Sequence, residues 1–136
     1  MSGLKNKIVV LTGASRGIGA ATALEMAPDG PHLVLCARSA EACAETKAAV
    51  EALGATAECH GFDVADTAAT SAFIDGIVAE HGRIDVLINN AGLGYMGSVQ
   101  DIPPADYLEV LQVNVLGPYN LISAVLPAMT EKNSGT

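Results

Sequence analysis

Short runs of consecutive apolar residues alternate along this chain with longer segments of helical character. Apolar runs occupy Ile8–Leu11 and Leu33–Ala37, a further one lies within Asp85–Asn89, and a less apolar one spans Ala55–Gly61. An uninterrupted apolar run is typical of a strand buried on both faces of a parallel sheet. We therefore predict four buried strands at these positions.

Helical segments lie between these runs, and turn-forming residues bound each of them. We predict helices over 17–27, 39–53 and 67–81, and from Pro104 onward with an interruption around Gly117-Pro118. Ser39 is placed to cap the second helix, and Asp66 directly precedes the third. Strands and helices therefore alternate over the whole chain.

This alternation predicts right-handed βαβ crossovers. The expected fold class is α/β, a Rossmann-type doubly wound parallel sheet with three αβα layers. Residues 1–136 would form a single domain, incomplete on its carboxyl-terminal side, because the sheet stops after the fourth strand and the helices that follow it. Ligands of such sheets bind beyond the carboxyl ends of the strands, where the strand order reverses.

The net charge and the cysteine spacing restrict the binding partners and the cellular compartment that we expect. The formal net charge of −8 would repel a nucleic-acid backbone, so we expect no nucleic-acid partner. Cys36, Cys43 and Cys59 show no CxxC spacing, which favours buried free thiols in a reducing compartment and predicts no metal site. The amino-terminal residues have no apolar signal segment, and no stretch approaches the roughly 18 apolar residues of a membrane span. We expect a cytoplasmic protein without a membrane partner.

The chemistry-bearing segment is the turn between the first strand and the first helix, Thr12–Gly19. It contains Gly13, Gly17 and Gly19. A pyrophosphate can approach a backbone that has no Cβ in the way, and the free N–H groups of a helix start point at its charge. A lone glycine pattern also serves ordinary tight turns, but its place between a strand and a helix favours dinucleotide binding.

Two motifs carry a family resemblance. The turn resembles the TGxxxGxG coenzyme loop of short-chain dehydrogenases/reductases, and Asn89-Asn90-Ala91-Gly92, after the fourth strand, resembles that family's NNAG motif. Asp63-Val64 and Asn114 continue the match, which runs from Lys7 to the end and resembles the amino-terminal half of such enzymes. Among relatives, the loop with Arg16, together with Arg38, looks like that of ketoacyl carrier-protein reductases and similar broad-range carbonyl reductases.

The resemblance implies a role for each matching residue. Asp63 would bond the adenine amino group, Val64 would support that ring, and Thr12 would tie the glycine loop to the NNAG segment. Asn114 would be a catalytic residue whose backbone positions a water of the proton relay, or else a polar residue satisfied at a helix irregularity. Plain strand-end hydrogen bonding is the alternative for Thr12 and Asn89. The implied coenzyme-binding residues are Gly13, Ser15, Arg16, Gly17, Ile18, Gly19, Arg38, Asp63, Val64, Asn90, Ala91 and Gly92.

The residue at the end of the second strand bears on which coenzyme binds. An NAD enzyme usually has Asp or Glu about twenty residues after the glycine loop, to accept from the ribose 2′-OH. This chain has Arg38 there. A guanidinium binds a 2′-phosphate with paired, charge-assisted hydrogen bonds, so Arg38 together with Arg16 predicts NADP(H). The alternative is that Arg38 is a solvated charge at a strand end.

The sequence also departs from the family pattern. Relatives pair the Asn with a Ser and with a Tyr-x-x-x-Lys dyad, but Tyr95, Tyr107 and Tyr119 have Val, Leu and Ser four residues on. We expect the chain to be a fragment of a protein of about 250 residues, ending just before the strand that would carry the Ser. An open edge at the fourth strand would then result, and helix faces would lose their cover around Leu111, Leu121, Ile122 and Val125.

The resulting prediction is an NADP(H)-dependent oxidoreductase that interconverts a carbonyl and an alcohol, with this chain supplying coenzyme binding only. The alternatives are a non-catalytic nucleotide-sensing or scaffolding module, and a structural domain whose site stays vacant. The resemblance implies a homo-oligomer, a dimer or tetramer formed through the late helices. Apolar residues there also suit internal packing.

Overall fold

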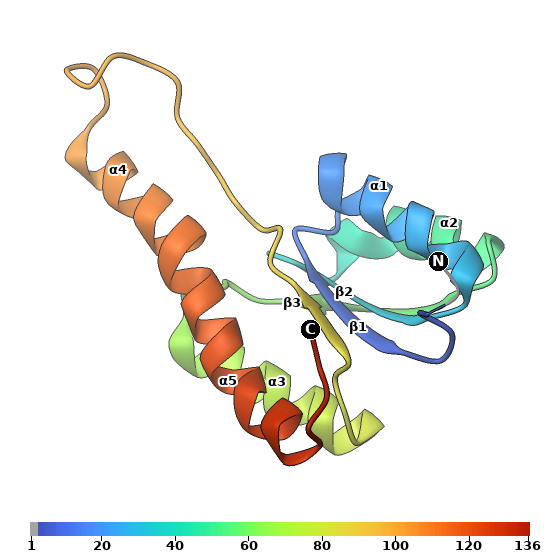
Figure 1. Cartoon of the computed structure of the whole chain (residues 1–136). Coiled ribbons are helices and arrows are strands. Elements are labelled where there is room, and N and C mark those ends of the chain that lie inside the picture. The colour runs from blue at the N-terminus through green and yellow to red at the C-terminus, as the bar shows by residue number, and fades with distance from the viewer. Residues whose placement is uncertain (1–2) are drawn as a thin grey trace.

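The computed structural model describes residues 3–136, which form one parallel sheet with helices on both faces (Figure 1). The strand order is β3-β2-β1-β4, and every paired strand is parallel to its neighbour. The strands are β1 (Ile8–Thr12), β2 (His32–Ala37), β3 (Thr56–Gly61) and β4 (Val86–Ile88). The helices are α1 (Gly17–Met26), η1 (Ala27–Asp29), η2 (Glu41–Cys43), α2 (Ala44–Ala52), α3 (Thr67–His81), α4 (Pro104–Leu111), η3 (Gln112–Leu116) and α5 (Gly117–Glu131).

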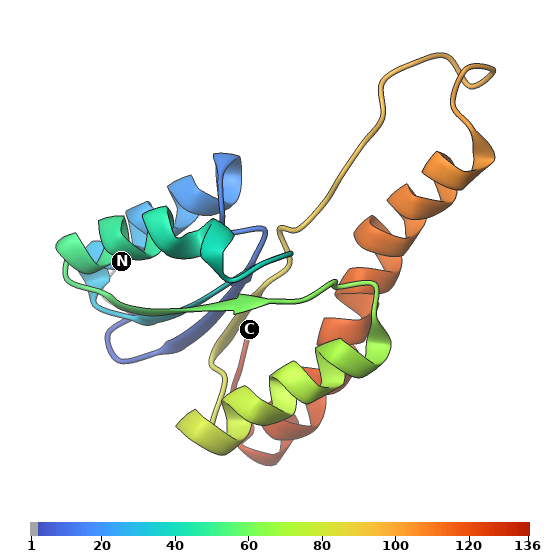
Figure 2. The same ribbon diagram turned by 180° about the vertical axis from the view of Figure 1, so that it is seen from behind.

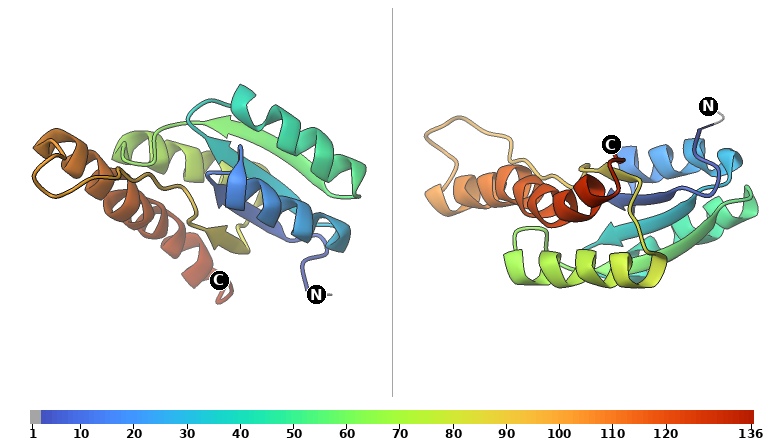
Figure 3. Two further views of the ribbon diagram at one scale, coloured as in Figure 1. Left: turned by 90° about the horizontal axis from the view of Figure 1, so that it is seen from above. Right: turned by 60° about the horizontal axis from the view of Figure 1, so that its bottom comes forward.

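The two faces of the sheet bury separate sets of side chains. Val9 and Leu11 of β1 face one core with residues of α1 and α2, while Val10 and Val34 face the other core with residues of α3 and α5. All four of these side chains are fully buried. Figures 2 and 3 show the resulting layers, with α1 and α2 on one side of the sheet and α3 and α5 on the other. The predicted Rossmann-type α/β fold is confirmed.

The predicted helix signals are correct for α3 and wrong for α2. Asp66 caps α3 by accepting a hydrogen bond from the Ala69 N–H at 2.9 Å, and Gly82 ends the helix in the left-handed conformation (φ 73°). Ser39 makes no side-chain cap. The 3₁₀ turn η2 comes first, and there it is the backbone carbonyl of Ser39 that accepts from the Ala42 N–H. The first turn of this segment is therefore held by the backbone carbonyl of Ser39 and not by its side-chain hydroxyl.

The late helix differs from its predicted form. We expected an interruption at Gly117-Pro118, but α4 and α5 run on through a π-helical segment, η3, that precedes these residues. Within it the Gly117 N–H donates to the carbonyl of Gln112, five residues back. Pro118 has no N–H for the Asn114 carbonyl four residues back, and a π-bulge rearranges such a turn without ending the helix.

The edge of the sheet beside β4 is partly covered. The Leu87 N–H donates to the Thr136 carbonyl at 2.9 Å, and the Thr136 N–H donates to the Asp85 carbonyl at 3.0 Å. The predicted open edge is therefore covered at this point by the last residue of the chain. Thr136 thus pairs with β4 through two backbone hydrogen bonds, although it belongs to none of the four strands.

One face of the late helix belongs to the core. Leu121 and Val125 are 1% and 2% exposed against α3 and the sheet, so the prediction that they lose their cover is wrong. Leu111, Leu116 and Ile122 are exposed. Core packing therefore claims one side of α5, and an apolar stripe remains on the other.

The length of the combined helix also corrects an expectation. Residues Pro104–Glu131 form one helix with an 18-residue window of mean hydropathy 1.2, of which 22% is buried. By length and composition alone it could cross a membrane. The sequence reading missed this because it treated the segment as two shorter helices. Within this helix, Leu121 and Val125 pack in the core with residues of α3 and the sheet.

Candidate functional site

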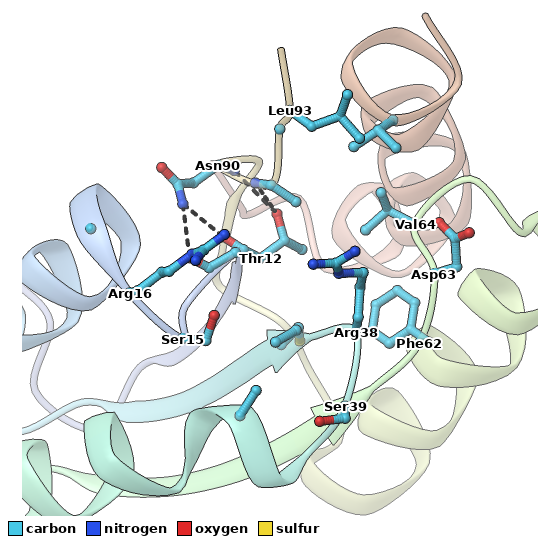
Figure 4. Close-up of a pocket in the computed structure, with 18 of the residues that line it drawn as sticks. Thr12, Ser15, Arg16, Arg38, Ser39, Phe62, Asp63, Val64, Asn90 and Leu93 are labelled. Carbon is cyan, nitrogen blue, oxygen red and sulfur yellow. Dashed lines mark hydrogen bonds between the residues drawn. The ribbon is translucent and has the colours of Figure 1, made fainter. Parts of the chain in front are cut away.

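A cavity of about 870 Å³ opens at the carboxyl ends of the strands. It lies where the strand order reverses between β1 and β4, the place where open α/β sheets bind their ligands. Figure 4 shows the side chains that line it, which come from the ends of all four strands and the segments that follow them. The lining residues are Thr12, Gly13, Ser15, Arg16, Gly17, Ile18, Cys36, Ala37, Arg38, Ser39, Ala42, Phe62, Asp63, Val64, Asn90, Ala91, Gly92, Leu93, Glu109 and Val113.

The floor of the cavity is the turn that joins β1 to α1. Gly17 has a φ of +57°, and a Cβ there would meet no atom within 4 Å. Its missing side chain therefore keeps space open in front of the first turn of α1. That turn has no side-chain cap and no acidic residue, so its N–H groups and the positive end of the helix dipole are available to an anion.

Gly13 and Gly19 serve the internal packing of this turn. A Cβ on Gly19 would lie 2.1 Å from the Gly13 carbonyl oxygen, and a Cβ on Gly13 would lie 2.9 Å from the Ala91 Cα. Gly19 is buried and does not line the cavity. Its small size lets α1 approach the turn, and its predicted role of permitting the approach of the coenzyme stays a prediction.

Thr12 and Asn90 join the glycine turn to the segment after β4. The Thr12 hydroxyl accepts from the backbone N–H groups of Asn90 and Ala91, at 3.1 and 3.0 Å, and donates to the Ile88 carbonyl at 3.4 Å. The Asn90 amide donates to the carbonyls of Thr12 and Gly13, at 3.1 and 3.2 Å. The predicted tie through Thr12 is present, and the Asn90 side-chain amide reinforces it.

Two arginines contribute positive charge to the cavity wall. Arg16 precedes α1, Arg38 follows β2, and both are exposed. Among residues 3–136 neither guanidinium forms an ion pair. Figure 4 shows the Arg38 side chain reaching into the cavity between Thr12 and Phe62. An anion bound here would meet a guanidinium that no carboxylate neutralises.

The far wall is made by the segment after β3. Asp63 folds this segment by accepting from the Ala65 N–H at 2.9 Å. The Val64 carbonyl accepts from the buried Asn120 amide at 3.0 Å, and a Cβ on Gly117 would lie 2.7 Å from the Val64 side chain. The start of α5 therefore holds Val64 in place.

Asn114 lies outside the cavity lining. Its side-chain oxygen accepts from the Leu93 N–H at 2.9 Å, and its amide donates to the Leu93 carbonyl at 2.8 Å. The structure thus places it at a helix irregularity with its side chain satisfied, one of the two readings of this residue. Both bonds also fix the chain directly after Gly92.

Several lining residues escaped the sequence reading. Phe62 and Ala37 directly precede Asp63 and Arg38, so their place at strand ends could have identified them. Glu109 and Val113 come from α4 and η3, far along the chain, and no local pattern marks them. Glu109 also accepts a hydrogen bond from the exposed Tyr95 hydroxyl, which raises the pKa of that tyrosine.

The chain matches the model of one protein family over most of its length. The family model described as short chain dehydrogenase matches residues 7–136. The chain belongs to the short-chain dehydrogenase family. Its members' fold and the glycine turn described above agree with that placement.

Similar members of the family come from different organisms. The chain is 38% identical to dehydrogenase/reductase SDR family member 7B of Bos taurus, covering 97% of this chain and 42% of that protein. It is also 38% identical to the ketoacyl reductase HetN of a Nostoc strain, covering 99% of this chain and 47% of that protein. The chain therefore spans less than half the length of these two relatives.

Solved structures of the family superpose closely. One is a metagenomic short-chain oxidoreductase in complex with NADP, 40% identical, with a TM-score of 0.92 over 99% of this chain and 60% of that one. Another is NAD⁺-bound xylitol dehydrogenase, 36% identical, with a TM-score of 0.92 over 98% of this chain and 52% of that one. Short-chain dehydrogenases of the same backbone thus bind either dinucleotide.

Proposed function

We propose that this short-chain dehydrogenase is NADP(H)-dependent and that the whole protein interconverts a carbonyl and an alcohol by hydride transfer. The observation that carries the coenzyme preference is Arg38 at the end of β2, on the cavity wall and without an ion-pair partner among the described residues. An NAD-binding protein of this fold usually has a carboxylate at that place. Here a carboxylate is replaced by a cation.

The residues present fit a dinucleotide. The uncapped start of α1 and the space in front of Gly17 suit a pyrophosphate, with Ser15 and Ile18 beside it. Arg16 and Arg38 would hold the 2′-phosphate. Asp63 and Val64 would flank the adenine ring, and Asn90, Ala91 and Gly92 would flank the second ribose. The coenzyme, when bound, supplies the hydride.

The chain's own residues orient this coenzyme. The bonds of Thr12 and Asn90 hold the glycine turn against the segment that follows β4, so the two walls of the cavity keep a fixed separation. Asn114 fixes Leu93 at the mouth of the cavity. Asn114 therefore positions the wall through its side chain, and its backbone role in proton transfer stays a prediction.

The test is to measure the dissociation constants of NADPH and NADH for the wild type and for Arg38→Asp. Loss of charge-assisted bonds to one phosphate should weaken NADPH binding about 10- to 100-fold and leave NADH binding within a few-fold. Lys132→Asp is the matched control, since it makes the same change of charge at the carboxyl-terminal end of α5. It should alter neither constant beyond the effect of ionic strength.

Equal affinities of the wild type for the two coenzymes would contradict the preference. So would an unchanged NADPH constant in Arg38→Asp. An effect of equal size in Lys132→Asp would assign the change to overall charge and would remove Arg38 from the site.

The second candidate function is nucleotide binding without turnover, by a nucleotide-sensing or scaffolding module. Carbonyl-dependent oxidation of NADPH distinguishes the two functions: turnover by the whole protein supports the reductase, and tight NADPH binding without turnover of any carbonyl supports the binding module. A cytoplasmic location and a homo-oligomer stay predictions.

A further inference from the structure

Three histidines surround one glutamate at the opposite end of the sheet from the nucleotide cavity. Glu58 of β3 is in contact with His32, the first residue of β2, and with His81, the last residue of α3. Its Oε1 lies 3.1 Å from the His32 Nε2 and 2.8 Å from the His81 Nε2. The third histidine, His60, contacts the other oxygen, Oε2, at 3.0 Å.

We propose that His32, Glu58 and His81 form a binding site for a divalent transition metal of the zinc class. Imidazole nitrogens and a carboxylate oxygen are ligands that zinc takes in proteins. One ligand atom from each of the three residues lies within 4.8 Å of the others. Three elements that are distant in sequence thus present one ligand each to a common point.

The contacts around the ligands suit coordination. His32 Nδ1 lies 2.8 Å from the Thr56 hydroxyl. A proton on this nitrogen can be donated to Thr56, which leaves Nε2 free to bind metal, and such outer hydrogen bonds usually orient metal-binding histidines. His60 holds the second oxygen of Glu58 in the same way and stays outside the ligand set. The fourth position would be filled by water.

The charge of the cluster favours a cation. Glu58 supplies the carboxylate of the cluster, which is an anionic ligand for a cation. Among the described residues its ion-pair partners are histidines, which carry charge only when protonated, and no lysine or arginine pairs with it. A bound metal would supply a permanent positive charge.

Solvent can reach the site. The side chains of His32, Glu58 and His81 are 24%, 23% and 17% exposed. That is enough for a metal to enter. The pairing of β2 with β3 and the last turn of α3 hold the three ligands close together. The prediction of no metal site rested on the cysteines alone and did not consider residues 26 and 23 positions apart.

A metal at this point would link β2, β3 and α3. The ladder of backbone hydrogen bonds already joins β2 to β3, so the metal would add a tie between this strand pair and the end of α3, and binding should stabilise the folded chain. The site is separate from the coenzyme cavity: His32 is the first residue of β2 and His81 the last residue of α3, whereas the cavity lies at the carboxyl ends of the strands.

The test is titration of the full chain, freed of metal with a chelator, with ZnCl₂ in a calorimeter and with CoCl₂ in a visible spectrophotometer. We expect one equivalent to bind, d–d absorption of four-coordinate Co²⁺ that Zn²⁺ displaces, and a rise in melting temperature of roughly 5–10 °C at a hundredfold excess of Zn²⁺ over its dissociation constant. NADPH affinity should be unchanged.

Variants assign the ligands. His81→Asn and Glu58→Gln should each lose the Co²⁺ absorption and the thermal shift, and Thr56→Val should weaken binding about tenfold. His60→Asn removes the outer hydrogen bond to Glu58 and leaves the three ligands in place, so, like Thr56→Val, it should weaken binding about tenfold but keep the Co²⁺ absorption. Melts of the metal-free variants show that each is folded. Two substitutions at the ligands are included in case one of them fails to fold.

Other results would overturn the proposal. Absence of saturable Zn²⁺ binding to the folded wild type would do so. Retained binding in a folded His81→Asn or Glu58→Gln variant, or loss of binding in His60→Asn, would reject this ligand set. Loss of binding in Cys59→Ser would place the metal on the opposite face of the sheet, at the thiols.

Discussion

The hydroxyl of Thr12 joins the two walls of the nucleotide cavity, and its removal gives the sharpest test of how the site is held. The side chain is 1% exposed, accepts two backbone hydrogen bonds from Asn90 and Ala91 and donates one to Ile88. Thr12→Val keeps the shape of the side chain and removes all three bonds. The change therefore isolates hydrogen bonding from packing.

The expected cost follows from the two N–H groups that lose their acceptor. An unsatisfied buried donor costs about 1–3 kcal/mol. Asn90 and Ala91 are only half-buried, so water can partly replace the hydroxyl, and the lower part of that range applies to each. We expect Thr12→Val to lose about 2–4 kcal/mol of unfolding free energy. With a urea slope of about 2 kcal/mol/M, this corresponds to a midpoint lowered by about 1–2 M.

The assay is urea unfolding followed by far-ultraviolet circular dichroism. Thr12→Ser keeps the hydroxyl and should lose less than about 1 kcal/mol. Thr22→Val is the matched control, because its hydroxyl bonds only to the Ile18 carbonyl on the exposed side of α1. A loss below about 0.5 kcal/mol in Thr12→Val, or an equal loss in Thr22→Val, would refute the reasoning.

Three further predictions use the same measurement. Gly117→Ala places a Cβ 2.7 Å from the Val64 side chain, so it should lower the unfolding free energy by about 1–3 kcal/mol and weaken NADPH binding. Gly76→Ala in α3 is the control: its Cβ would meet no atom within 4 Å, and it should raise the unfolding free energy by about 0.5–1 kcal/mol. Similar effects of the two variants would contradict this prediction. Leu121→Ala, at a side chain 1% exposed, should cost about 2–5 kcal/mol, and Leu126→Ala, at one 50% exposed, far less; equal costs would place α5 outside the core. The pKa of Glu58 is lowered from 4.5 to about 2, so its contribution to stability is present above pH 4.5 and is lost as the pH falls toward 2. Glu58→Gln should therefore lose less unfolding free energy over that interval than the wild type. Parallel pH profiles of the two proteins would be evidence against the cluster.

The sequence was most informative where local rules and burial agree. The apolar run Ile8–Leu11 and the glycine turn after it are continuous in the chain, so the first strand, the first helix and most of the cavity floor could be predicted from them. The segments after β3 and β4 were identified through the family resemblance, and they meet at the cavity because parallel strands bring their carboxyl ends together. Gly19 shows the limit: its spacing was read correctly, but only the structure shows that its missing Cβ serves the packing against Gly13.

The features that were missed depend on contacts between distant residues. Asn114 of the π-helical segment bonds Leu93, 21 residues away, and no local pattern in the sequence predicts that contact. The ligand cluster joins His32, Glu58 and His81, which acquire a common location only when the register of β2 against β3 and the length of α3 are known. A periodicity argument assigns each of these residues to an element and cannot say which side chains meet.

The π-helical segment η3 also sets how α4 is rotated about the helix axis relative to α5. Each residue of a regular helix turns the chain by about 100°, so a five-residue turn displaces everything before it by one such step. Deleting one residue from Gln112–Leu116 would turn the π-helical segment into regular α-helix. Leu121 of α5 would stay in the core, but α4 would rotate about its axis and move Glu109 away from the cavity wall. Insertions and deletions should therefore be tolerated less in these five residues than in the exposed segment between Gly94 and Gln100.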